Sequence, residues 1–263
     1  MQIVVCIKQV PQTTEVKIDP QTNTLVREGV SSIINPFDMY AIEEAVRLKE
    51  KFQAKTTVIT MGPPQAEAAL REALSLGIDN AVHLCDRAFA GSDTWTTSLV
   101  LAKAIEKLSP VDLVICGKQA SDGDTAQVGP GIASHLDLPQ ATYVRKIDTI
   151  HLDTNPKIMV VERLLEDGYE ILELKLPALI TVVKEINEPR LPSLKGKLRA
   201  KKEVIPAWTH KDIGLSQEAV GLKGSPTQVV KIFTPPPKKG GKIFEGEPQE
   251  AVSGLIKEIE DLL

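Results

Sequence analysis

Short apolar runs alternate with longer amphipathic stretches through the first half of the chain. The runs are rich in valine and isoleucine, as in strands buried on both faces of a sheet, and are predicted at residues 3–7, 56–61, 81–85 and 111–116. Between them, apolar residues recur at helical spacing in stretches that open near Asn35, Ala66, Ser92 or Asp93, and Thr125. This alternation predicts βαβ units and a doubly wound, mostly parallel α/β sheet with helices on both faces.

The pattern changes after about Ala141. Two strand-like runs, 157–165 and 169–176, flank Glu166-Asp167-Gly168 and predict a β-hairpin, and 178–183 reads as a further strand. From Asn187 the chain is rich in proline, glycine and basic residues without periodicity, so we expect an extended arm that leaves the domain. A linker, TPPPKKGGK, and a terminal amphipathic helix over 248–262 follow. We therefore divide the chain into an α/β domain, 1–187, and a C-terminal arm, linker and helix, 188–263.

Residues 10–29 alternate polar and apolar positions around Asp19-Pro20, which predicts a small hairpin or flap beyond the first strand. The next segment, NPFD, contains helix-start signals. Asn35 suits the N-cap, Pro36 the first helical position and Asp38 the acid of a capping box. Capping alone accounts for these residue types.

Composition is ordinary for a globular protein, with 42% hydrophobic and 25% charged residues. A net charge of −4, with no aromatic residues among the lysines of 195–202, argues against nucleic-acid binding. No apolar run reaches the roughly 20 residues of a membrane span, and the N-terminus lacks the pattern of a signal peptide. We expect a cytoplasmic protein.

Cysteines and histidines give no catalytic or metal-binding pattern. Cys6, Cys85 and Cys116 lie far apart without a CxxC pair, which argues against zinc and iron–sulfur sites and favours reduced, buried thiols. The four histidines are equally scattered and none sits beside a serine or cysteine. We predict no metal and no catalytic acid, base or nucleophile.

The stretch 111–139, VDLVICGKQASDGDTAQVGPGIASHLDLP, is the main candidate for a binding site. A buried strand, a loop of small residues and a helix opening at Thr125 place free backbone N–H groups at the mouth of a sheet, where anions bind. Asp122 and Asp124 would repel phosphate but suit a helix cap or a ribose or adenine contact. A capped loop without any ligand stays an equal alternative, since no generic nucleotide motif is present.

Ligands of parallel sheets sit beyond the C-terminal strand ends. Residues 6–9, 61–63, 85–87 and 117–127 follow those ends and should line one crevice.

Several stretches, in order, resemble the β (small) subunit of electron transfer flavoproteins. These are NPFD at 35–38, EEAVRLKE at 43–50, GKQASDGDTAQVG at 117–129, VERLLEDGYEILELKLPALIT at 161–181 and NEPRLPSLKGKLRAKK at 187–202. The resemblance spans nearly the whole chain.

This resemblance implies an adenine-nucleotide-binding, Rossmann-like fold and an obligate α subunit that carries a redox FAD. It also implies an adenine nucleotide in the crevice, either a structural AMP or a second FAD that takes a hydride from NADH. Electrons then pass to ferredoxin or flavodoxin and, through the α-subunit FAD, to an acyl-CoA dehydrogenase-type flavoprotein. The arm resembles the loop that docks the dehydrogenase, which implies Leu191 or Leu194 as an anchor, with Lys195, Lys197 and Arg199 beside it. The implied cofactor-binding residues are Cys6, Asn35, Phe37, Asp38, Met61, Gln119, Ala120, Asp122, Gly123, Asp124, Thr125, Ala126, Gln127, Val128, Gly129 and Pro130.

The loop DGDTAQVGP resembles the electron-bifurcating, two-FAD members, and Gly123 leaves room at the loop, so we favour FAD over AMP. No run of basic residues faces the pyrophosphate, which leaves the loop N–H groups, Thr125 and Gln127 to hold it. An ATP-binding sensor domain of similar fold is the alternative from another class. An ATP-dependent ligase or nucleotidyl transferase is disfavoured, because no glycine follows the first strand in IKQVPQTT.

Overall fold

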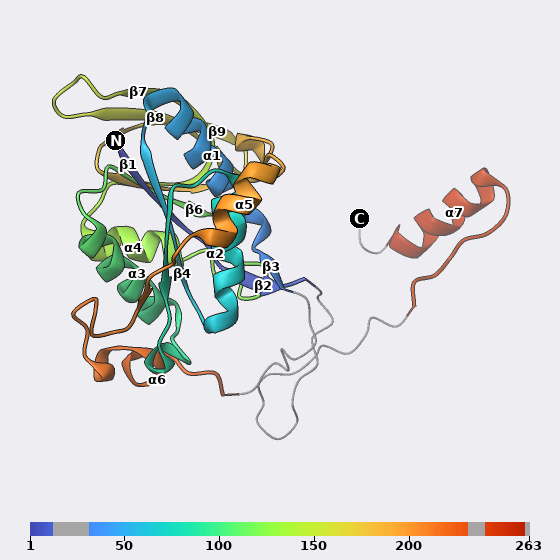
Figure 1. Cartoon of the computed structure of the whole chain (residues 1–263). Helices are drawn as coiled ribbons and strands as arrows, with labels where there is room; N and C mark the ends of the chain where they lie inside the picture. Colours follow the sequence, from blue (N-terminus) through green and yellow to red (C-terminus); the bar gives the residue numbers. More distant parts are fainter. Residues whose placement is uncertain (13–31, 231–239, 261–263) are drawn as a thin grey trace. The chain divides into compact units, whose positions relative to one another are not determined.

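The computed structural model describes residues 1–12, 32–230 and 240–260 (Figure 1). The chain separates into two compact units, Met1–Val230 and Lys231–Leu263. Residues 188–230, which we assigned to the C-terminal arm, lie within the first unit. In the second unit, α7 (Pro248–Ile259) exposes Val252, Leu255 and Ile256, and the expected end of this helix, residue 262, lies outside the described residues.

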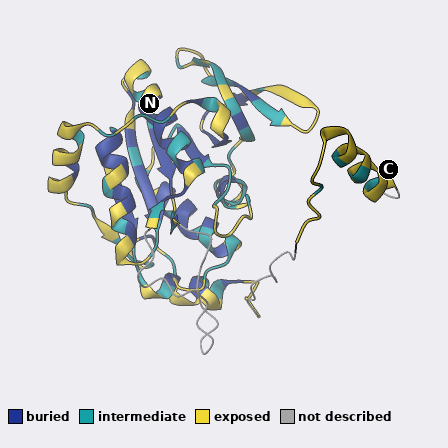
Figure 2. Ribbon diagram, turned by 90° about the vertical axis from the view of Figure 1, so that its right-hand side faces the viewer, coloured by how far each residue is buried: buried dark blue, intermediate teal, exposed yellow. Residues whose placement is uncertain are grey.

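The described part of the first unit contains a nine-stranded sheet with the order β11-β5-β4-β1-β6-β10-β7-β8-β9. Its parallel centre consists of β1 (Gln2–Cys6), β4 (Lys55–Met61), β5 (Asn80–Leu84), β6 (Leu113–Gly117) and β10 (Ala178–Val182). Ile3 and Val5 pack against one layer of helices, and Val4 and Cys6 against the other. These central strands are buried (Figure 2), which confirms the sequence pattern.

Helices cover both faces of the sheet, which confirms the doubly wound α/β class. α1 (Pro36–Phe52) and α2 (Glu67–Leu76) share a core with Ile3 and Val5, and α3 (Thr94–Leu108) and α4 (Val128–Leu136) share the other core. Asp93 caps α3 by accepting the N–H of Thr96 at 2.9 Å. The short helices are η1 (Pro64–Ala66), η2 (Arg87–Phe89), η3 (Lys184–Ile186), η4 (Gln217–Ala219) and α6 (Gly221–Gly224).

An antiparallel meander extends the sheet on one side. β8 (Ile158–Leu165) and β9 (Gly168–Lys175) form the predicted hairpin, and β7 (Gln140–His151) joins it to β10. The sequence pattern missed β7, because this strand is only partly buried and its polar residues hide the alternation. β2 (Gln9–Pro11) and β3 (Ser32–Ile34) pair antiparallel. Of the flap predicted at 10–29, only residues 10–12 lie in the described part, so the flap itself stays a prediction.

The segment 188–202 contains a helix, contrary to our expectation. α5 (Leu194–Lys202) begins after Ser193, whose hydroxyl accepts the N–H of Gly196 at 2.9 Å, and it packs on α2. A Cβ at Gly196 would lie 2.2 Å from the carbonyl oxygen of Ser75, so glycine permits this close packing. The chain then adds β11 (Ala207–Trp208), parallel to β5, to the sheet edge.

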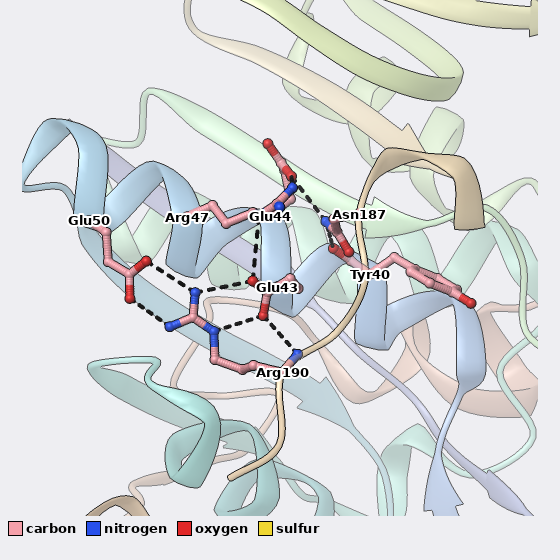
Figure 3. Close-up of polar contacts among 7 residues, drawn as sticks. All are labelled: Tyr40, Glu43, Glu44, Arg47, Glu50, Asn187 and Arg190. Atoms are coloured by element: carbon pink, nitrogen blue, oxygen red, sulfur yellow. Dashed lines mark hydrogen bonds and ion pairs between the residues drawn. The ribbon is translucent and has the colours of Figure 1, made fainter. Parts of the chain in front are cut away.

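An ion-pair clamp attaches the segment before α5 to α1 (Figure 3). The Arg190 guanidinium donates to Glu43 at 2.8 and 3.1 Å and to Glu50 at 2.6 and 3.1 Å. Asn187 donates to the carboxylate of Glu44 and the carbonyl of Tyr40, both at 3.0 Å. Glu43 and Glu44 are buried, so the clamp supplies partners for carboxylates that water does not reach.

Candidate functional site

The strand order reverses at β1, which lies between β4 and β6. β1 and β6 run parallel, with Cys6 opposite Cys116. In doubly wound sheets, ligands bind outside the carboxyl ends of the strands at such a switch point. The segments that leave these two ends are residues 7–9 and 118–127, and the second contains half of the predicted nucleotide-binding residues.

Asn35 joins the start of α1 to the loop after β6. Its Nδ2 donates to the carbonyl of Gln119 at 2.8 Å and to Asp38 at 2.9 Å, and its Oδ1 accepts the N–H of Ser121 at 3.0 Å. Asn35 occupies the N-cap position and Pro36 the first turn of α1, as predicted, but the Asn35 side chain makes no capping hydrogen bond. The predicted capping explanation is therefore wrong. Both polar atoms of the buried amide are used to fix the loop.

Asp38 is a buried carboxyl group that connects three elements. Its Oδ2 accepts the N–H of Lys8, just after β1, at 2.7 Å, and its Oδ1 accepts from Asn35. A Cβ on Gly117 would lie 2.2 Å from Oδ1, so β6 contacts the same group. Burial raises the pKa of Asp38 to about 7, against the hydrogen bonds from Asn35 and Lys8, which lower it.

This pKa predicts a pH dependence of stability. A folded-state pKa above the unfolded value stabilises the fold at low pH, and the stabilisation is lost as pH rises from about 4 to 7. The free energy of unfolding of the wild type, minus that of Asp38→Asn, should therefore fall by up to about 1.4 kcal/mol per pH unit in this window. Urea unfolding of both proteins at several pH values measures it.

Asp79→Asn is the control, with the opposite sign. Burial raises the pKa of Asp79, but hydrogen bonds from Lys49 and Thr56 outweigh it and lower the pKa overall. The free energy of unfolding of the wild type, minus that of Asp79→Asn, should therefore shrink as pH falls. A flat profile for Asp38→Asn would contradict the raised pKa.

The loop before α4 has an unusual backbone. α4 begins at Val128 rather than at Thr125, and Gln127, not Asp124, occupies its N-cap position. Asp124 (φ 52°) and Ala126 (φ 55°) adopt the left-handed conformation, which non-glycine residues rarely do. Asp124 accepts a hydrogen bond from the Gln119 side chain instead of capping a helix. Strained backbone of this kind concentrates at ligand-binding loops.

The glycines of this region differ in their surroundings. A Cβ on Gly129 would lie 2.5 Å from the side chain of Thr181, so this glycine lets α4 pack on β10. Among the described residues, only the Lys8 ammonium would lie within 4 Å of a Cβ on Gly123, at 3.9 Å. Gly123 therefore faces open space within that part of the chain, and a ligand in this space stays a prediction.

A cavity of about 340 Å³ adjoins the other end of the loop. Arg163 contributes the charged group among its lining residues and donates to Thr142 at 3.2 Å, while its buried Nε has no hydrogen-bond partner in the described residues. Tyr143, which also lines the cavity, has a left-handed backbone (φ 60°). The full lining is Ala126, Gln127, Pro130, Gln140, Thr142, Tyr143 and Arg163.

The predicted site residues therefore fall into groups. Cys6 and Met61 end β1 and β4. Asn35, Phe37 and Asp38 open α1 beside the loop. Ala126, Gln127 and Pro130 line the cavity, and the loop from Asp122 to Thr125 is exposed. Direct ligand contact by any of them stays a prediction.

Sequence reasoning missed the cations around this loop. Lys8 forms an ion pair with Asp122 at 2.6 Å. Lys118 lies 4.8 Å from the ring centre of Tyr143 and 5.7 Å from that of Phe37. The missed residues are single cations from separate elements, so no basic run announces them. Their one sequence signal is position, since Lys8 and Lys118 each follow the end of a central strand.

The predicted docking residues lie on or before α5. Leu191 and Leu194 are exposed, as is Leu198, which we did not predict and which shares a helix face with Leu194. Lys195 and Lys197 are also exposed. The Arg199 guanidinium donates to the carbonyls of Leu74, at 2.8 Å, and Ile78 at the end of α2, and its docking role stays a prediction.

In the described residues, no group of three or more His, Cys, Asp or Glu side chains is arranged to bind a metal ion. The same residues include no helix with the length and apolarity needed to cross a membrane.

Comparison with known proteins agrees with this architecture. Residues 22–213 match the electron transfer flavoprotein domain. The chain is 55% identical to an electron transfer flavoprotein subunit beta of Thermoanaerobacterium thermosaccharolyticum, over 98% of both chains. It is 51% identical to the caffeyl-CoA reductase-Etf complex subunit CarD of Acetobacterium woodii, over 97% of this chain and 96% of CarD. It is 50% identical to protein FixA of Azotobacter vinelandii, over 90% of this chain and 85% of FixA. The chain therefore belongs to the electron transfer flavoprotein family, among its β subunits.

Proposed function

We propose that this β subunit holds FAD at the loop 117–130 and works with an α subunit as a bifurcating electron transfer flavoprotein. A bound FAD would supply the redox chemistry, exchanging electrons with NAD(H), with ferredoxin or flavodoxin and, through the α-subunit FAD, with an acyl-CoA dehydrogenase-type partner. The residues of this chain would bind and orient the nucleotide. Structural AMP at the same loop is the alternative.

The observation that carries the proposal is the open space above Gly123 at the switch point of the sheet. Buried Asn35 and Asp38 connect the loop to α1 and to the end of β1 through hydrogen bonds. Lys8 adds a positive charge at the same point. A loop held by hydrogen bonds, free space beside Gly123 and the positive charge of Lys8 suit a phosphate-containing ligand.

The relatives favour the assembly. CarD, by its name, is a subunit of a complex with caffeyl-CoA reductase. An acyl-CoA dehydrogenase-type flavoprotein is accordingly our candidate for the partner that docks on this chain. Its docking surface would be the apolar ridge Leu191, Leu194 and Leu198, with Lys195 and Lys197 beside it.

The test of the proposal is nucleotide stoichiometry. The chain is co-expressed with its α subunit, and nucleotides released by denaturation are counted per heterodimer. Two FAD and no AMP are expected. One FAD and one AMP would reduce the chain to a holder of structural AMP, and no nucleotide on this subunit would contradict the site and favour the sensor-type alternative.

The replacement Gly123→Leu should remove the nucleotide from this subunit without unfolding it. The leucine side chain would enter the open space that we assign to the ligand, and it meets no backbone there. The measurement is FAD or AMP content per heterodimer, with urea unfolding as the check on stability. A variant that retains both nucleotides would show that the ligand lies elsewhere.

A further inference from the structure

Lys8 connects the two loops that leave the switch point. Its ammonium lies 2.6 Å from Asp122 Oδ1, which joins the end of β1 to the loop after β6. The Lys8 side chain is 46% exposed, whereas that of Asp122 is 16% exposed. The pair thus sits at the surface, where an ion pair by itself stabilises little.

The backbone of Lys8 is held on both sides. Its N–H donates to the buried Asp38 at 2.7 Å, and its carbonyl accepts the N–H of Asn35 at 2.8 Å. Only the side chain remains free to change partner, and its flexible stem carries a point charge that suits phosphate. The root of this side chain is therefore fixed at the mouth of the proposed site.

The nearby cations have other contacts. Lys118 lies against the rings of Phe37 and Tyr143, and Arg163 lines the cavity at the far end of the loop. Of the described cations, Lys8 is the one next to Gly123, with its ammonium 3.9 Å from the position that a Cβ would take. A phosphate group entering the open space at Gly123 would meet the Lys8 ammonium first.

We propose that Lys8 recognises the 5′-phosphate of the bound adenine nucleotide and that Asp122 holds the ammonium in place until the phosphate replaces it. The exchange swaps one anionic partner for another, so Lys8 stays paired throughout. Asp122 turns toward water on its exposed loop. This inference rests on the proposed nucleotide site and names the residue that reads the phosphate, a group common to AMP and FAD.

The test compares ligands with and without the phosphate. Binding of AMP, FAD and adenosine to the nucleotide-depleted αβ complex is measured by calorimetry at two salt concentrations. Lys8→Gln should lower the affinity for AMP about 10- to 100-fold, the range for a charge-assisted hydrogen bond, and leave the affinity for adenosine within about twofold of the wild-type value. Lys8→Arg, which keeps the charge, should retain most of the AMP affinity, and the Lys8→Gln complex should lose part of the salt dependence.

Asp122→Asn distinguishes recognition of the phosphate by Lys8 from a structural role in which the Lys8–Asp122 ion pair only holds the two loops together. If Asp122 competes with the phosphate, removing its charge should tighten AMP about two- to fivefold, and Lys8→Gln with Asp122→Asn should behave like Lys8→Gln alone. If Asp122→Asn and Lys8→Gln lowered the affinity for AMP equally, the ion pair would have a structural role only, and the inference would be overturned. Equal losses for AMP and adenosine would also overturn it. FAD that responds like AMP identifies the shared phosphate as the recognised group. Failure of the wild-type complex to bind any adenine nucleotide would instead overturn the proposed function itself.

Discussion

Gly117→Ala is expected to lower the free energy of unfolding by about 3 kcal/mol and to deplete the nucleotide site. A Cβ at this position would lie 2.2 Å from Asp38 Oδ1, 2.7 Å from the carbonyl carbon of Phe37 and 2.8 Å from the Asp38 nitrogen. Two of these atoms are backbone, so the first turn of α1 must shift. The shift would separate Asp38 from Asn35 and from the N–H of Lys8, which support the loop.

The matched control is Gly123→Ala in the same loop. Within the part of the chain that the structure describes, its added Cβ would have a single neighbour within 4 Å, the flexible end of Lys8, so stability should change by less than about 0.5 kcal/mol. Urea unfolding of the two variants and the wild type, with nucleotide content measured in parallel, gives the comparison. Equal midpoints for Gly117→Ala and the wild type would contradict the close approach of α1 to β6.

Arg190→Ala is expected to lower the free energy of unfolding by about 3 kcal/mol. It removes both hydrogen bonds of the guanidinium to Glu43, which is only 5% exposed, and both contacts to Glu50. Arg190 holds segment 187–193 on α1 (Figure 3). In the Arg190→Ala variant, this segment should therefore exchange its amide hydrogens faster than in the wild type. Chemical unfolding reports the first effect and hydrogen exchange the second.

Arg47→Ala is the appropriate comparison, because Arg47 lies 3.6 Å from the same Glu43 carboxylate. Its side chain is half-exposed, and its two contacts, to Glu43 at 3.6 Å and to Glu44 at 3.9 Å, are long, so the loss should stay below about 1 kcal/mol. Similar losses for the two variants would mean that the clamp contributes no more than an ordinary surface charge pair. Binding of the proposed dehydrogenase-type partner should weaken for Arg190→Ala only, since α5 follows the clamp directly.

The alternation of apolar runs and amphipathic helices was sufficient to predict the central fold. Strands such as β1 and β6 are buried on both faces, so nearly every residue in them carries the signal. β7 and α5 gave weaker signals. β7 is half-exposed, and α5 buries only Ala200, so its pattern is dominated by lysines. Helix α5 forms because Ser193 caps it and α2 supports it, which depends on tertiary contacts rather than on periodicity.

The location of the candidate site was predictable from the sequence, but the hydrogen bonds and ion pairs that build it were not. The end of β6 and its small residues marked the loop from sequence alone. Asn35 and Asp38 were recognised, but the capping explanation was wrong, because a helix cap and a contact across 84 residues require the same side chains. Lys8 was missed because its partner, Asp122, is 114 residues away, and no local pattern records such a pair.

Helix α5 enters any encounter already folded. The Arg190 clamp fixes the chain before it, β11 fixes the chain after it, and Arg71 and Arg199 bind carbonyls across the helix pair. Ordering a residue costs roughly 1–2 kcal/mol of backbone entropy, and here that cost is met during folding of the subunit. A partner that docks on the leucine ridge therefore loses little affinity to disorder. Among partners of this kind, selectivity should show in how long each one stays bound rather than in how fast it arrives.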